Sequence, residues 1–113
     1  MTNLWEETIE LLKENGKTFD DVLFIQGIDF KITKENFESV AKKTDYDSGF
    51  GAQRVATDLV LVGDDWWIER AEYDGSEWWE YKSIPMEIDK VEHIYHLANG
   101  MWDTLKELNE DKL

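Results

Sequence analysis

The chain has 113 residues and a formal net charge of −14, and a length of this order predicts a single domain covering residues 1–113. An acidic balance this strong excludes direct binding of nucleic acid through its phosphates and argues against docking on anionic lipid. The absence of cysteine excludes disulfides, thiolate zinc sites, iron–sulfur clusters and a cysteine nucleophile. No apolar run approaches the length that spans a bilayer, and no signal-peptide pattern opens the chain. We therefore expect a soluble, cytoplasmic protein.

The first predicted element is a helix over residues 3–15. Trp5, Ile9 and Leu12 recur at helical spacing and form an apolar stripe. Asn3 is a residue type that caps free amides at a helix start, and Gly16 is a plausible stop.

The next segments predict two short strands and a second helix. The apolar, β-branched run 22–25 indicates a strand, and 29–32 is a second candidate. Thr33 is suited to cap a helix that continues to about Lys43. Residues 44–53 are rich in Asp and Gly and predict a loop.

The middle of the chain predicts an antiparallel meander. Residues 58–62 are apolar on both faces and indicate a central strand. Strands over 66–73 and 77–84 follow, joined by an Asp-Gly turn at 74–75 that is typical of a hairpin, and Pro85 ends the second one.

The C-terminal segment allows two interpretations. Apolar residues recur at three- and four-residue steps from Val91 to Leu108, which favours a helix over residues 89–109. The Asn-Gly pair at 99–100 could break it, which would leave 91–97 as a strand. With the helix preferred, the fold class is α+β: an antiparallel sheet of three or more strands with about three helices packed mainly on one face.

The charge is concentrated in residues 45–89, where twelve acidic residues face three basic ones and give a balance of −9 of the total −14. A solvated face that keeps the protein soluble explains this. The alternative is an electrostatic surface directed at a basic partner.

Two tryptophan pairs, 66–67 and 78–79, flank the predicted Asp-Gly turn. Adjacent strand residues point to opposite faces, so each pair should place one indole on each face of the sheet. Both could be core, but tryptophan inside a charged rim is also typical of an interface anchor. Arg70 could stack on a tryptophan across the hairpin or pair with Glu80, depending on register. The predicted partner-binding residues are Asp64, Asp65, Trp66, Trp67, Glu69, Glu72, Asp74, Glu77, Trp78 and Glu80.

Patterns that carry catalytic or metal chemistry are weak. His93 and His96 would share a helix face, but the order is E-H-x-x-H and not the H-E-x-x-H of metalloproteases. The segment from Asp45 opens like a calcium loop but has Phe50 and Ala56 where glycine and glutamate are required. We expect no metal site, no cofactor, no catalytic residues and no enzymatic activity.

The strings G-x-G-A-Q, D-W-W-I-E-R and E-Y-D-G-S-E-W-W-E-Y within residues 45–85 resemble a group of small proteins encoded by phages and prophages of Gram-positive bacteria. This group has no assigned chemistry, so no residue role is implied. The resemblance implies a setting in which small acidic proteins bind and block host defence machinery, including restriction enzymes and CRISPR nucleases.

Three functions follow from these observations. The first is a non-enzymatic inhibitor that presents acidic residues to a host nucleic-acid-binding protein in place of nucleic acid. The second is a structural or accessory phage protein whose acidity serves solubility. The third is a small ligand- or metal-binding module using Arg54, the loop at Asp45 or the histidine pair.

Overall fold

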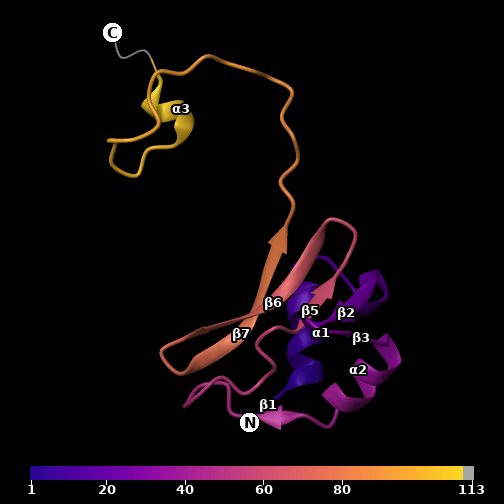
Figure 1. Cartoon of the computed structure of the whole chain (residues 1–113). Coiled ribbons are helices and arrows are strands. Elements are labelled where there is room, and N and C mark those ends of the chain that lie inside the picture. Colours follow the sequence, from indigo (N-terminus) through magenta and orange to yellow (C-terminus); the bar gives the residue numbers. More distant parts are fainter. Residues whose placement is uncertain (111–113) are drawn as a thin grey trace.

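The computed structural model describes residues 1–110 (Figure 1). Its helices are α1 (Leu4–Glu14), the single-turn η1 (Phe19–Asp21), α2 (Lys34–Ala41) and α3 (Leu105–Leu108). Its strands are β1 (Thr2–Asn3), β2 (Phe24–Gln26), β3 (Lys31–Ile32), β4 (Asp45–Tyr46), β5 (Val60–Val62), β6 (Trp66–Tyr73) and β7 (Ser76–Ser83).

Five of the strands form one antiparallel sheet in the order β3-β2-β5-β6-β7. The α+β class with an antiparallel sheet is therefore confirmed, and β5 is the central strand, as its two-sided apolar pattern predicts. The β6–β7 hairpin pairs from Trp66↔Ser83 to Tyr73↔Ser76. Its turn holds Asp74 at φ 51° and Gly75 at φ 86°, the left-handed pair that a two-residue hairpin turn requires.

The N-terminus is tied to the segment after α2. Asn3 caps α1 as predicted, because its Oδ1 accepts a hydrogen bond from the Glu6 amide at 3.0 Å. Its Nδ2 also donates to Asp45 Oδ1 at 2.9 Å, beside the short pairing of β1 with β4. The prediction of a loop over 44–53 therefore missed a two-residue strand.

The core lies between one face of the sheet and the helices α1 and α2. Ile25, Leu61 and Ile68, which lie directly opposite one another on three adjacent strands, are fully buried there. Leu4 and Leu12 of α1, with Phe37 and Ala41 of α2, pack in the same cluster. The opposite face carries no helix, and we call it the open face. No helix in the described residues is long and apolar enough to cross a membrane.

The predicted helix over 89–109 is wrong, and the alternative strand over 91–97 is also not formed. Residues 84–104 have no helix or strand, and α3 has one turn. Figure 1 shows this segment, which we call the C-terminal arm (residues 84–110), leaving the end of β7 and carrying α3 away from the sheet. An amphipathic helix draws most of its stability from packing, and the arm has no surface beneath it. The radius of gyration is accordingly 19.1 Å, against about 13 Å for a compact chain of this length.

Candidate protein-binding site

The tryptophan pairs divide between the two faces of the sheet as predicted. Trp66 and Trp79 are buried on the helix-covered face, whereas Trp67 is half-buried and Trp78 is 41% exposed. The Trp79 ring is held against α1, since its Nε1 donates a hydrogen bond to Thr8 Oγ1 at 2.9 Å. Trp66 is consequently core and is not available to a partner.

Beside Trp79 lies a buried charged cluster centred on Arg70. The register pairs Arg70 with Trp79, and the guanidinium lies over that indole ring at 4.8 Å from its centre. Nη2 of Arg70 donates to Glu77 Oε2 at 2.7 Å and to the Tyr46 hydroxyl at 2.9 Å. Nη1 reaches Glu7 Oε1 at 3.3 Å. Of the two alternatives for Arg70, stacking on tryptophan is correct, and its acidic partners are Glu77 and Glu7.

The prediction that Glu77 contacts a partner is therefore wrong, because the residue is only 5% exposed. Its carboxylate also accepts hydrogen bonds from the Arg54 and Val55 amides. Burial disfavours the charged form, but the hydrogen bonds from Arg54, Arg70 and Val55 outweigh it and hold the pKa of Glu77 below its usual value. Its role is to fix the loop before β5 against the hairpin.

Tyr46 completes the cluster. Its hydroxyl donates to Glu7 Oε1 at 2.6 Å and accepts from Arg70. Burial, with the hydrogen bond to Glu7, raises the pKa of Tyr46 to about 12. Apart from Arg70 Nε, which is buried without a hydrogen-bond partner, these groups bond to one another, so the cluster is a structural junction between α1, β4, β6 and β7.

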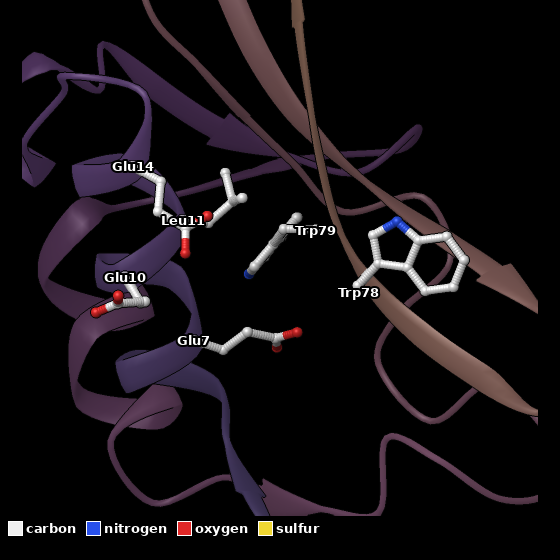
Figure 2. Close-up of a pocket in the computed structure, with 6 residues that line it drawn as sticks. All are labelled: Glu7, Glu10, Leu11, Glu14, Trp78 and Trp79. Atoms are coloured by element: carbon white, nitrogen blue, oxygen red, sulfur yellow. The ribbon is translucent and has the colours of Figure 1, made fainter.

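An acidic groove lies at the surface, next to this junction. It is lined by Glu7, Glu10, Leu11 and Glu14 of α1 and by Trp78 and Trp79 of β7. Figure 2 shows Trp79 between the helix and the strand, with the three glutamates along the helix and Trp78 on the other side of β7. We call it the α1–β7 groove. Glu10 and Glu14 form no ion pair within residues 1–110, so the groove presents uncompensated negative charge.

The groove runs beside an unpaired strand edge. β7 is the last strand of the sheet, and the Glu77 amide donates away from β6 to Ser48 O at 2.8 Å. By strand alternation the amides of Trp79, Tyr81 and Ser83 point the same way. They have no hydrogen-bond partner in the part of the chain that the structure describes.

The remaining predicted site residues do not form one surface. Asp64 and Asp65 are exposed at the turn before β6, whereas Glu72 and Asp74 are exposed at the other end of the hairpin. Glu69 and Glu80 are opposite each other on the open face. Glu69 accepts a hydrogen bond from Trp67 Nε1 at 2.7 Å, and Glu80 lies 3.6 Å from Lys82 Nζ.

The acidic residues of α1 are the part of this site that sequence reasoning missed. Glu7, Glu10 and Glu14 have the three- and four-residue spacing of one helix face, and that spacing was the available signal. No group of three or more His, Asp or Glu side chains within residues 1–110 is placed to bind a metal ion. Comparisons of the chain with protein-family models, curated proteins and solved structures gave no match.

Proposed function

We propose that this chain is a non-enzymatic binding protein whose α1–β7 groove holds a basic segment of a partner protein. The observation that supports this is the placement of unpartnered carboxylates, Glu10 and Glu14, on one side of the free β7 edge and of an exposed indole, Trp78, on its other side. A lysine or arginine side chain of a bound segment would pair with the glutamates, and the next side chain of that segment, which points to the opposite face, would pack on the Trp78 ring.

The free edge of β7 supplies the second half of the recognition. An extended partner segment would hydrogen-bond to the amides and carbonyls of Trp79, Tyr81 and Ser83, in the mode of strand addition. Its alternate side chains, spaced by about 6.7 Å, would then point toward the glutamates of α1. The main chain provides affinity in this arrangement, and the acidic groove selects for basic side chains.

The resemblance to phage-encoded proteins gives this activity a setting. The partner class we propose is a nucleic-acid-binding defence protein of the host cytoplasm, such as a restriction enzyme or a CRISPR nuclease, which presents a basic channel. The chain would act as an inhibitor that occupies the channel with carboxylates in place of phosphates. Association driven by such opposite charges is fast and sensitive to salt.

The test is capture from lysate of a Gram-positive host, with recovered proteins identified by mass spectrometry at low and high salt. The groove variant is Glu10→Lys with Glu14→Lys. The matched control is Asp29→Lys with Glu35→Lys, which makes the same charge change at exposed residues of the β2–β3 turn and α2. We expect a nucleic-acid-binding protein that the control retains, the groove variant loses, and added DNA or RNA displaces. Equal capture by both variants would contradict the proposal.

A further inference from the structure

The C-terminal arm is rich in exposed large apolar side chains. Nine of its large apolar side chains are more than half exposed: Ile84, Met86, Ile88, Val91, Tyr95, Leu97, Met101, Trp102 and Leu105. Contiguous exposed apolar surface on this scale marks an interaction site. The arm as it stands in the lone chain therefore lacks a partner surface.

The arm is also held in a conformation that its residues disfavour. Trp102 has φ 60° and is 94% exposed, and Asn99 has φ 76°. A bulky residue in the left-handed region is a strained outlier, and no buried contact of Trp102 offsets that strain. A helical conformation would remove both positive φ angles.

A helix over the arm would carry one continuous apolar stripe. The stripe residues recur at alternating steps of three and four and comprise Val91, Ile94, Tyr95, Ala98, Met101, Trp102, Leu105 and Leu108. This spacing is that of a helix seam that packs against another surface. His93 and His96 are exposed and would lie on the other side of such a helix from the stripe.

The open face of the sheet also carries partly exposed apolar side chains, against which the stripe can pack. Phe24, Val62 and Trp67 are neighbours across β2, β5 and β6 on this face, and each is only half-buried. α1 and α2 pack against the other face. A helix over residues 89–109 would be about 31 Å long, and the eight-residue strands β6 and β7 are about 27 Å long, so the two match in length.

The direction of the arm points to a second molecule. Residues 84–94 contain no turn or bend, and Figure 1 shows them continuing past the end of β7 instead of folding back across the sheet. An arm leaving the body in this direction reaches another copy more directly than its own open face.

We propose that two copies of this chain exchange their C-terminal arms, each arm forming a helix over residues 89–109 whose stripe packs on the open face of the other copy. The exchange is reciprocal, as a two-fold symmetric dimer requires. It uses the centre of the open face at Phe24, Val62 and Trp67, and so leaves the α1–β7 groove free. The inference is independent of the proposed function.

The first experiment is sedimentation velocity of the full chain over a concentration series, with helix content from circular dichroism. The stripe variant is Tyr95→Asp with Trp102→Asp, and the matched control is His93→Asp with His96→Asp. Tyr95 and Trp102 are 79% and 94% exposed, and both histidines are exposed, so neither change disturbs the core. We expect a dimer whose dissociation constant rises at least about 30-fold in the stripe variant, with loss of helix, and is unchanged in the control. A monomer at all concentrations, or equal effects of both variants, would overturn the proposal.

The second experiment separates exchange from packing within one chain. The protein has no cysteine, so Gln26→Cys on the open face and Ala98→Cys on the stripe can be joined by a bismaleimide. An equimolar mixture of the two single variants should give a crosslinked dimer. A crosslink within one chain of the double variant, with none in the mixture, would show that the arm covers its own sheet and would overturn the exchange.

Discussion

Arg70 lies opposite Trp79 in the β6–β7 ladder, with its guanidinium 4.8 Å from the centre of the indole ring. This pair connects the hairpin to α1, because Trp79 donates a hydrogen bond to Thr8 of α1 and Arg70 forms an ion pair with Glu7 of the same helix. The groove proposed to bind a partner has α1 as one wall and β7 as the other. Its width is therefore set by the buried cluster beneath it.

Removal of Arg70 should strongly destabilise the fold. Arg70→Ala leaves the Glu77 carboxylate buried without its charge partner, and breaking a buried pair in this way costs about 3–5 kcal/mol. Lys82→Ala, at an exposed residue of the same hairpin, should change the free energy of unfolding by less than about 0.5 kcal/mol. Urea unfolding of both variants measures this. Equal stability of the two variants would show that the cluster makes no net contribution to the free energy of unfolding.

Glu77 should make stability depend on pH in the acidic range. Its pKa is lowered in the folded protein from an ordinary 4.5, so the stabilisation is present above that pH and is lost as pH falls through the folded pKa. Glu77→Gln should therefore be less stable than the unmodified chain at pH 7, and the difference should shrink progressively below pH 4.5. Urea unfolding from pH 7 to pH 3 tests it, and a difference that stays constant with pH would contradict the assignment.

Tyr46 should titrate at unusually high pH. Its pKa is about 12 in the folded protein against 10 when unfolded, so it contributes stability below pH 10 that is lost as pH rises toward 12. Ultraviolet titration of the phenolate should contain a component near pH 12 that is missing in Tyr46→Phe. The variant should also lose about 1–3 kcal/mol of stability, since buried groups of Glu7 and Arg70 lose a hydrogen bond. A titration unchanged by the variant would refute this.

The two indoles of the second tryptophan pair should behave in opposite ways. Trp79 is 3% exposed and hydrogen-bonded to Thr8, so Trp79→Ala should cost about 3–5 kcal/mol. Trp78→Ala should cost much less stability and instead weaken partner binding, because its ring is 41% exposed on the open face beside the free edge of β7. Urea unfolding and a binding titration of both variants separate the two roles. Similar unfolding energies would mean that Trp78 is a core residue.

Local signals in the sequence predicted the parts of the fold that depend on a few neighbouring residues. The Asp-Gly turn is sufficient to define the β6–β7 hairpin, and Asn3 and Thr33 cap α1 and α2 as their residue types indicate. The helix over 89–109 was predicted from periodicity alone. Periodicity reports an apolar stripe, whereas a stable helix also needs a surface to pack on, and the lone chain places none beside the arm.

The candidate site could be predicted only in part, because it joins elements distant in the chain. Strand alternation predicted that each tryptophan pair would be split between the faces, and Trp78 is indeed the exposed member of its pair. The packing of α1 beside the edge of β7 depends on tertiary contacts such as Trp79 with Thr8, 71 residues apart. Without that contact, nothing in the sequence relates Glu10 and Glu14 to Trp78.

The acidic residues at the two ends of the hairpin should differ from those of the groove in their effect on binding. Asp64 and Asp65 lie beside Ile84, about 17 Å along β7 from Trp79 at a rise of roughly 3.4 Å per residue. At that distance, beyond the screening length of about 8 Å at physiological salt, they act on a groove-bound segment only weakly. Asp64→Lys with Asp65→Lys should therefore lower affinity for the captured partner much less than Glu10→Lys with Glu14→Lys, and the groove variant should also flatten the dependence of affinity on salt. A binding titration from 50 to 500 mM salt, as a rough working range, compares them. If reversal at Asp64 and Asp65 has the larger effect, the basic partner lies along the Asp64–Asp65 end of the sheet, and the groove is not its binding site.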